Sequence, residues 1–314
     1  MDVNDLLPYC RVHNIEERRD AGWLIESLWL RDAAGLIGGQ PKCCKSWLGL
    51  DAAVSVASGT PCLGRFAVTE KGPTLVYLAE DQVSEVRARV EGICKSRGLD
   101  VAALDLTVIT ASVLRLDDEL DRQRLWRTVE RTSPRLILLD PLVRLHRLDE
   151  NNSRDIAGIL GFLREIQRHF KTAVILTHHA SKRANSRPGQ GLRGSSDLHA
   201  FGDSNLYLAR SEDDLVLTVE HRSAAAIDKV RLQLAAGDHV HLRVIGEPVE
   251  AAPPALTTTL EDKIVEHLAR EAKPIGRNDL RGRLRTNNQR FGQALATLLA
   301  NGRVAATSGG IALC

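Results

Sequence analysis

The sequence lacks the features that would place it in a membrane or outside the cell. Its 314 residues contain no apolar run that approaches the roughly 18–20 residues needed to cross a bilayer. Charges are scattered through the first twenty residues, where a secretory signal would need an apolar segment. There is also no internal repeat and no low-complexity tract. The sequence therefore predicts neither secretion nor membrane insertion.

Cysteine spacing and net charge are equally uninformative about a specialised role. The six cysteines include no C-x-x-C pair and no zinc-like spacing with histidines, so a reduced, cytoplasmic protein is expected. The net charge is only +2, which means that a nucleic-acid surface must be a local patch. The length is sufficient for a sizeable core and suggests about two domains.

Short apolar runs alternate with longer helical patterns through the first two hundred residues. After a strand that ends near 39, runs of strand type occupy 74–79, 106–110, 135–140 and 173–178, and helical patterns separate them, for example at 118–132 and 153–170. This alternation predicts an α/β fold with a mainly parallel sheet covered on both faces. Shorter strands between 205 and 244 are expected to extend the sheet in antiparallel fashion. Residues 1–34 are expected to pack onto the core.

A proline-rich linker at 251–256 predicts a boundary between a domain at 1–250 and a second domain at 257–314. The second domain is predicted to contain three helices, near 259–268, 277–284 and 287–301, and a hairpin that turns at Gly309-Gly310. Three helices followed by a hairpin is a winged-helix arrangement. With nine Lys or Arg against five acidic residues, this domain carries a net charge of +4 and is the basic part of the chain.

The stretch 35–47 has the layout of a phosphate-binding loop, in which a strand runs into a glycine-bearing loop that opens a helix. In such loops backbone N–H groups surround a phosphate, a lysine reaches the β and γ oxygens, and a Ser or Thr hydroxyl holds Mg²⁺. Lys45 and Ser46 have the required spacing from Gly39, but Cys44 replaces the second glycine. The nucleotide-binding residues expected here are Gly39, Lys42, Cys44, Lys45, Ser46 and Trp47.

Phosphoryl transfer also needs a carboxylate opposite the loop, and Asp140 ends an apolar strand where such a group is expected. The alternative for Asp140 is a turn residue before Pro141. Glu80 ends another strand and is the candidate general base, with Asp81 as a possible substitute. Both acids have a structural alternative, as charges that stabilise a helix N-terminus.

Histidines and a basic loop complete the candidate site. His178-His179 follows a strand, where a histidine either senses the γ-phosphate or is a satisfied polar residue at the sheet edge. The glycine-rich stretch 181–194 is either a solvated loop or a functional one. Its Lys182, Arg183 and Arg187 are candidates for contact with a nucleic-acid backbone. Arg193, flanked by glycines, is a candidate to reach a phosphate bound by a neighbouring subunit.

In the basic C-terminal domain, polar and basic residues gather at the start of the third helix, the end that enters the major groove in helix-turn-helix folds. Winged helices also dock proteins, so both roles stay open. The candidate DNA contacts are Arg283, Arg285 and Arg290.

Taken together, these segments resemble the RecA/KaiC-like ATPases, and among them the plasmid RepA-type hexameric helicases. The matching pieces are 38–46, 77–81, 138–146 with 149–151, 177–179 and 192–196. The resemblance implies a RecA-like P-loop core that assembles as a ring, expected to be a hexamer, with ATP bound between subunits. It assigns phosphate and Mg²⁺ to Lys45 and Ser46 and the Walker B carboxylate to Asp140. It further assigns the base to Glu80, the sensor to His179 or His178, and the finger acting in trans to Arg193.

Three functions follow as hypotheses. The first is a Mg²⁺-dependent ATPase that binds DNA and acts as a ring helicase or translocase in replication of a mobile element, with single-stranded DNA in the ring and duplex on the winged helix. The second is a DNA-binding or scaffold protein whose nucleotide site is regulatory or inactive. The third is a signalling or defence NTPase that docks a protein partner.

Overall fold

The computed structural model describes residues 9–15, 22–149, 153–179, 196–211, 214–237, 239–246, 260–269, 274–284, 286, 288–307 and 310–313. The predicted calls on Lys182, Arg183, Arg187, Arg193 and Arg285 lie outside these residues. The chain divides into two compact units, Met1–Val249 and Glu250–Cys314. Each unit has its own hydrophobic core.

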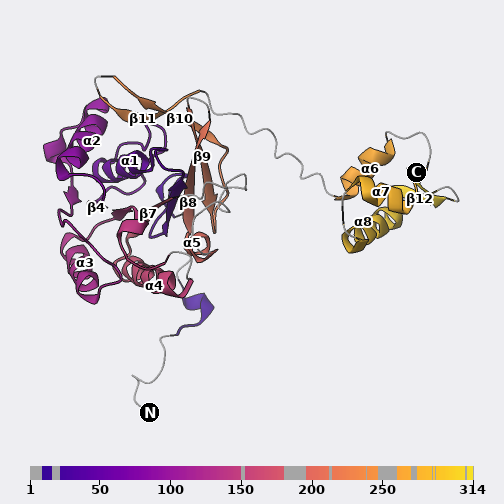
Figure 1. Ribbon diagram of the computed structural model, residues 1–314, viewed down its shortest axis with the longest axis horizontal. Coiled ribbons are helices and arrows are strands. Elements are labelled where there is room, and N and C mark those ends of the chain that lie inside the picture. Colours follow the sequence, from indigo (N-terminus) through magenta and orange to yellow (C-terminus); the bar gives the residue numbers. More distant parts are fainter. Residues whose placement is uncertain are drawn as a thin grey trace, which may run out of the picture. The chain divides into compact units, whose positions relative to one another are not determined.

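A nine-stranded sheet forms the centre of the first unit, in the order β11-β10-β9-β8-β3-β7-β6-β4-β5 (Figure 1). Six neighbouring strands, from β8 to β5, are parallel, and β9, β10 and β11 continue the sheet in antiparallel fashion. The predicted α/β fold with a mainly parallel sheet is therefore confirmed. The strands are β3 (Ala34–Gly39), β4 (Thr74–Leu78), β5 (Leu106–Val108), β6 (Leu136–Asp140), β7 (Ala173–His179), β8 (Ser204–Ser211), β9 (Asp214–His221), β10 (Val230–Ala235) and β11 (His241–Val244).

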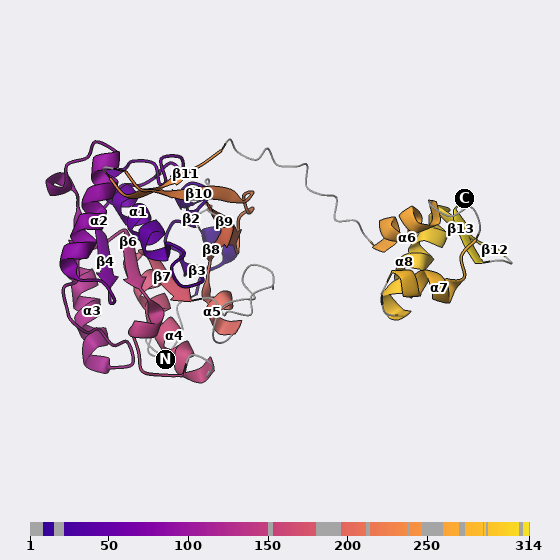
Figure 2. The same cartoon turned by 45° about the horizontal axis from the view of Figure 1, so that its top comes forward.

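Helices cover both faces of this sheet (Figures 1 and 2). Side chains alternate along β6, so Leu138 packs in the cluster with helices α1 (Lys45–Ser58) and α2 (Val83–Ser96). Leu139 packs in the opposite cluster, with helices α3 (Glu119–Thr132), α4 (Ser153–Phe170) and α5 (Ser196–Phe201). Burial on both faces explains why the parallel strands read as continuous apolar runs.

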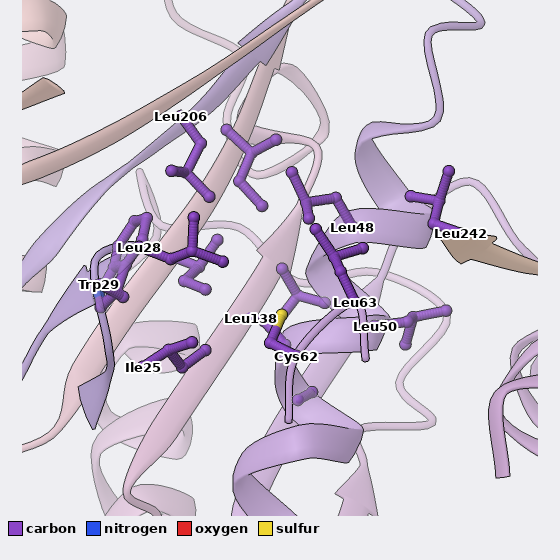
Figure 3. Close-up of a cluster of buried hydrophobic side chains, with 14 of the residues drawn as sticks. Ile25, Leu28, Trp29, Leu48, Leu50, Cys62, Leu63, Leu138, Leu206 and Leu242 are labelled. Atoms are coloured by element: carbon purple, nitrogen blue, oxygen red, sulfur yellow. The ribbon is translucent and has the colours of Figure 1, made fainter. Parts of the chain in front are cut away.

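The lead-in forms a small hairpin, β1 (Trp23–Ile25) and β2 (Trp29–Leu30), that closes one side of the core. Trp29 is 1% exposed, and its indole Nε1 donates to the Ala33 carbonyl at 3.2 Å. Figure 3 shows Trp29 among apolar side chains from α1, β6 and β8. The expected packing is borne out for 22–34, whereas 9–15 are exposed, and the hairpin itself was not foreseen.

Helix α1 lies unusually close to strand β6. A Cβ added at Gly49 would stand 2.7 Å from Cδ1 of Leu138, which is fully buried. The helix ends at Gly59, whose φ of 80° is left-handed and whose N–H donates to the Ser55 carbonyl at 2.7 Å.

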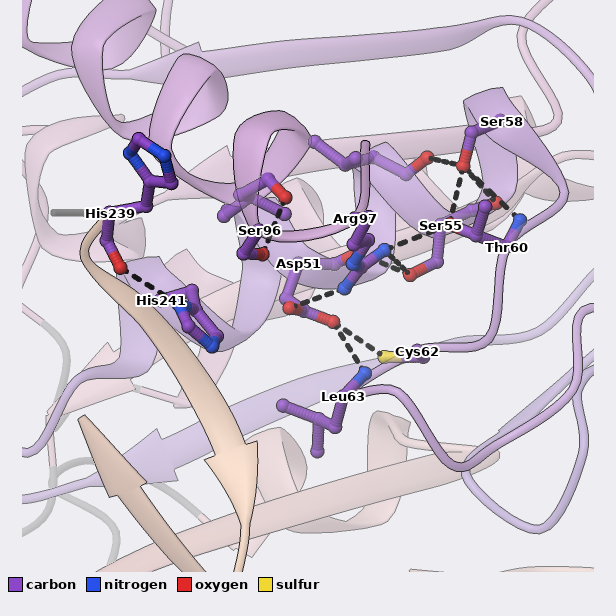
Figure 4. A network of polar contacts seen from close by, with 12 residues as sticks. Asp51, Ser55, Ser58, Thr60, Cys62, Leu63, Ser96, Arg97, His239 and His241 are labelled. Atoms are coloured by element: carbon purple, nitrogen blue, oxygen red, sulfur yellow. Dashed lines mark hydrogen bonds and ion pairs between the residues drawn. The ribbon is translucent and has the colours of Figure 1, made fainter. Parts of the chain in front are cut away.

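A buried polar network ties α1 to the end of α2 and to the loop after α1 (Figure 4). Asp51, 1% exposed, accepts from Arg97 Nη2 at 2.6 Å and from the Leu63 N–H at 2.7 Å. The other guanidinium nitrogen of Arg97 donates to Ser55 Oγ at 2.8 Å and to Thr60 Oγ1 at 3.1 Å. A buried ion pair of this kind is retained only when further hydrogen bonds satisfy its atoms, as they do here.

Strand β8 corrects one expectation. It was predicted to join the sheet as an antiparallel strand, but it is parallel to β3, with Gly35 opposite Ser204. The antiparallel part starts one strand later, at the β8–β9 pair. The reason lies in the connection from β7, which includes α5 and returns the chain to the amino edge of the sheet before β8 begins.

The second unit contains α6 (Leu260–Ala269), α7 (Arg277–Arg283), α8 (Asn288–Ala300), β12 (Val304–Thr307) and β13 (Gly310–Leu313). The two strands pair in antiparallel fashion, with Thr307 opposite Gly310. Ile275, just before α7, forms a further bridge to Ile311, with N–H···O distances of 3.0 and 2.8 Å. The order of three helices and a hairpin is the predicted one. Within the described residues, no helix is both long and apolar enough to cross a membrane.

Candidate active site

The carboxyl ends of β3, β4, β6 and β7 meet at one edge of the parallel sheet, where ligands bind in open α/β folds. A cavity of about 280 Å³ lies at this edge. Residues from all four strand ends line it, as does the start of α1. The lining residues are Lys42, Cys43, Cys44, Lys45, Ser46, Trp47, Glu80, Arg89, Asp140, Pro141 and His179.

The loop between β3 and α1 begins at a position that admits only glycine. A Cβ on Gly39 would stand 2.5 Å from the Leu208 carbonyl oxygen of β8 and 2.6 Å from Cys43 Sγ. Strand β8 supports the loop a second time, because Arg210 Nη2 donates to the Lys42 carbonyl at 3.0 Å. No motif pointed to this contact with Arg210, which arises from tertiary packing.

Cys44 occupies the left-handed region, with φ of 63° and ψ of 27°, directly before the first helical residue. A glycine adopts this conformation at little cost, whereas an L-residue loses roughly 1–2 kcal/mol. Lys42 also has φ of 63°. Cys44 in place of glycine therefore keeps the loop conformation of the motif, but its backbone is strained. Burial raises the pKa of the Cys43 and Cys44 thiols, so both are neutral near pH 7.

The side chain of Lys45 is 6% exposed and is directed into the loop. Its Nζ donates to the carbonyl oxygens of Gly39 at 3.1 Å and Gln40 at 2.9 Å. Nζ also lies 3.2 Å from His179 Nδ1. Because an ammonium group has only donors, Nδ1 accepts, and the ring proton of a neutral His179 is placed on Nε2.

Asp140 is 5% exposed at the end of β6. It accepts a hydrogen bond from the Thr177 hydroxyl, and the Ser46 hydroxyl is near enough to lower its pKa. Burial raises the pKa of Asp140, and these hydroxyls and the charge of Lys45 oppose that rise. Ser46 and Asp140, predicted from two distant segments, are thus neighbours, while Thr177 was not predicted.

Glu80 and Asp81 follow β4, but their side chains lie in different surroundings. Glu80 lines the cavity, its side chain is 45% exposed, and Oε1 accepts from Arg144 Nε at 2.7 Å. Asp81 is held at both oxygens by the guanidinium of Arg89, at 2.7 and 2.8 Å. The Arg89 guanidinium also lies 5.6 Å from the ring centroid of Trp47. Neither Arg89 nor Arg144 carried a sequence signal.

The two histidines lie on opposite sides of β7, as alternation along a strand requires. His179 lines the cavity, whereas His178 is 1% exposed and is not among its lining residues. Of the two, His179 is the one beside the loop lysine.

The predicted DNA-contact residues are only partly described. Arg283 was expected at the start of the third helix, but it ends α7, where Nη2 donates to Asp279 Oδ2 at 2.9 Å. The backbone of Arg290 belongs to α8, and its side chain lies outside the described part of the chain.

The oxygen donors of this cavity suit Mg²⁺. That ion takes one or two protein oxygens and completes its shell with water and phosphate. The Ser46 hydroxyl and the buried Asp140 carboxylate form such a pair. Among the described residues no group of three or more His, Cys, Asp or Glu is placed to hold a metal by itself.

Comparison with solved structures gives similar folds at low identity. One similar structure is that of a DnaB-like replicative helicase, which was described together with its interactions with primase. The TM-score is 0.51 and the identity 17%, over 65% of this chain and 56% of the helicase chain. This chain thus matches little more than half of that helicase. The RadB recombinase has a TM-score of 0.48 and 16% identity, over 65% of this chain and 88% of its own.

The similarity to the helicase establishes the fold, a RecA-like α/β core with a large, mainly parallel sheet. No curated protein matches the chain. A family model described as an AAA domain matches residues 12–185, which is more than half of the sequence and includes the whole cavity. The chain therefore belongs to the AAA domain family.

Proposed function

We propose that this chain is a Mg²⁺-dependent ATPase that binds DNA and acts as a RepA-like ring helicase or translocase in the replication of a mobile element. The observation that carries the proposal is the convergence of Lys45, Ser46 and Asp140 in one cavity. These residues come from the loop and from a strand 94 positions later in the chain. A lysine, a hydroxyl and a buried carboxylate at the carboxyl edge of a parallel sheet suit a nucleoside triphosphate.

Each side chain has a role that follows from its position. Lys45 already points at the loop carbonyls, so it would exchange these for phosphate oxygens. His179, with its proton placed on Nε2 by the Lys45 contact, would donate that proton to the γ-phosphate. Trp47, Lys42 and Cys44 line the remaining wall of the cavity.

Ser46 and Asp140 would hold Mg²⁺, Ser46 directly and Asp140 as the Walker B carboxylate. When bound, the ion neutralises charge that builds on the phosphate oxygens. Both side chains line the same cavity, so each could contact the ion or its water.

Glu80 would orient and deprotonate the attacking water. Its carboxylate is now engaged by Arg144, and this ion pair joins two exposed side chains, so its net energy is small. Breaking it to free Glu80 would therefore cost little. Asp81 is a poorer base, since both of its oxygens accept from Arg89.

The second unit supports a winged-helix role in duplex binding. Its hairpin follows α8, and Ile275 adds the bridge that places a short extended segment before α7 beside β13. Arg277, Arg283 and Arg303 are exposed on this unit. Single-stranded DNA would contact Lys182, Arg183 and Arg187 within a homo-oligomeric ring. Arg285 and Arg290 would contact duplex DNA. Arg193 would act as the finger across the subunit boundary, with a hexamer as the expected ring.

The decisive experiment measures ATP hydrolysis by the full chain with and without single-stranded DNA. Lys45→Ala should lower hydrolysis by roughly 10²-fold or more, because it removes a charge aimed at the transferred phosphate. Lys95→Ala, at an exposed lysine of α2, is the control and should leave the rate unchanged. Hydrolysis that DNA stimulates and Lys45→Ala abolishes supports the proposal. Hydrolysis that survives in Lys45→Ala contradicts it.

One observation favours a second candidate, a DNA-binding or scaffold protein with a weak or regulatory nucleotide site. Cys44 puts a side chain and backbone strain at a position where a phosphate-binding loop has glycine. This candidate predicts nucleotide binding without turnover. Hydrolysis measured beside equilibrium binding of ATP separates the two functions.

A further inference from the structure

A second cavity lies at the opposite edge of the sheet from the phosphate loop. It has a volume of about 530 Å³ and opens among the segments that lead into β3, β7 and β8. The six residues of β3 separate the two edges by about 20 Å at 3.3 Å per residue. None of its lining residues lines the loop cavity. The charged residues that matter are Arg31, Arg164, Arg168, Lys171, Asp203 and Arg222.

Positive charge is in excess within this cavity. Five Lys or Arg line it against two carboxylates, Asp32 and Asp203, which leaves a charge of +3. Arg31 also pairs with Glu70 outside the cavity, at 3.3 Å, and counting Glu70 leaves +2. The cavity therefore keeps an excess of positive charge when Glu70 is included in the count.

The floor of the cavity is fixed by a shared carboxylate. Asp203 accepts from Arg164 and, at 3.2 Å, from Arg222 Nη1. It also accepts from the Ala34 N–H at 3.2 Å, and Arg164 donates its other terminal nitrogen to the Phe201 carbonyl. Two arginines from different elements are thus held in place, with one carboxylate between them.

The rim carries two further cations at the end of α4. Arg168 and Lys171 are exposed, and within the described residues their side chains make no hydrogen bond or ion pair. Cations near a helix C-terminus stabilise the helix through its dipole. That effect accounts for Arg168 and Lys171 by themselves. Asp203 accounts for the convergence of Arg164 and Arg222, and the cavity still carries an excess of positive charge.

We propose that this cavity binds phosphate groups of a polyanion, either the backbone of a nucleic acid or a compact polyphosphate. Arginine forks match phosphate geometry, and Lys171 adds a point charge. The volume is within the range of small-molecule sites. The site does not depend on the ATPase proposal, because the two cavities share no residue.

The test compares wild type with the double variant Arg168→Glu/Lys171→Glu in the full chain. Both side chains are exposed and unengaged among the described residues, so the variant should fold, and thermal unfolding checks this. The double variant Arg168→Ala/Lys171→Ala replaces it if reversal prevents folding. The control is Lys95→Glu/Arg131→Glu, which makes the same charge change in the last turns of α2 and α3, away from the cavity.

Two probes distinguish the ligands. A fluorescein-labelled oligothymidylate of about 20 nucleotides is titrated at several salt concentrations, since phosphate contacts govern the salt slope. Inorganic tripolyphosphate is titrated by calorimetry in a Lys45→Ala background, which weakens the loop cavity as a competing site.

A loss of oligonucleotide affinity on the order of tenfold, with a salt slope smaller by about 1.4 for two lost contacts to a single strand, assigns the site to nucleic acid. A loss confined to tripolyphosphate assigns it to a compact polyphosphate. The proposal is overturned if both affinities are unchanged, or if the control variant loses as much. ATP hydrolysis without DNA should stay at the wild-type rate in every outcome that supports the site.

Discussion

Among single residues, Glu80 and Asp81 differ in what holds them. We expect Glu80→Gln to lower the rate of ATP hydrolysis by roughly 10²–10⁴-fold, because the proposed base is lost. Glutamine can still accept from Arg144, so nucleotide binding should persist. Single-turnover hydrolysis and equilibrium ATP binding are the two measurements.

Asp81→Asn is the comparison for that variant. It removes a charge that pairs with Arg89 at the cavity wall, so it should affect binding more than the chemical step. If Asp81→Asn abolishes hydrolysis while Glu80→Gln does not, the roles of the two acids are exchanged.

A second prediction concerns the strained loop position. Cys44→Gly relieves the left-handed backbone but adds freedom to the unfolded chain, so the net gain in stability should be below about 1 kcal/mol. The larger effect should be a marked gain in ATP affinity, since the loop can then close on phosphate without a Cβ. Calorimetric titration with ATP measures the gain.

Ser133→Gly is the matched control. Ser133 has φ of 42° at the end of α3 and does not line the loop cavity. Its substitution should alter stability by a similar small amount and leave ATP affinity unchanged. Equal ATP affinity in wild type and Cys44→Gly would show that the cysteine does not restrain the loop.

Site residues that follow a local sequence motif could be predicted, whereas site residues that tertiary packing brings to the site could not. Lys45 and Ser46 follow Gly39 at motif spacing, and Asp140 ends an apolar strand, so each had a signal of its own. Arg89 of α2 lines the cavity, and Arg210 of β8 donates to the Lys42 carbonyl of the loop. The positions of both arginines depend on how α2 and β8 pack. No spacing in the sequence encodes those distances.

At the scale of elements, the Asp51–Arg97 pair fastens two helices. Asp51→Ala should lower the free energy of unfolding by about 3–5 kcal/mol, because it leaves the buried guanidinium without its charge partner. Urea unfolding of the full chain is the measurement.

The exposed pair Arg87–Glu91 on α2 supplies the control. Its atoms lie 2.8 Å apart at i,i+4 spacing, with the arginine side chain 76% exposed. Glu91→Ala should lower the free energy of unfolding far less than Asp51→Ala, because solvent screens this exposed pair. Similar losses in both variants would mean that the buried network does not fasten α1 to α2.

Helices and strands were predicted correctly where a buried element has a long run of apolar residues. The strands β4, β6 and β7 each contain a run of four apolar residues and were predicted within about a residue of their ends. The β1–β2 hairpin was missed because its strands have three and two residues, too few for a period to show. The direction of β8 depended on the path of the preceding connection, which composition does not determine.

For the molecule as a whole, the two units have separate cores, and this makes truncation informative. Removing 257–314 should weaken duplex DNA binding on the order of tenfold at matched salt, since it removes the basic unit. Assembly, followed by sizing with and without ATP and DNA, should change less. Unaltered duplex affinity in the truncated protein contradicts the assignment of DNA binding to this unit.

The close approach of Gly49 to Leu138 has a mechanical meaning. Helix α1 begins at the phosphate loop and strand β6 ends at Asp140, and between them there is no room for even one added carbon. Densely packed interiors have low compressibility and transmit strain. Helix α1 and strand β6 therefore form one stiff unit, which transmits a displacement of the phosphate loop to the Asp140 carboxylate.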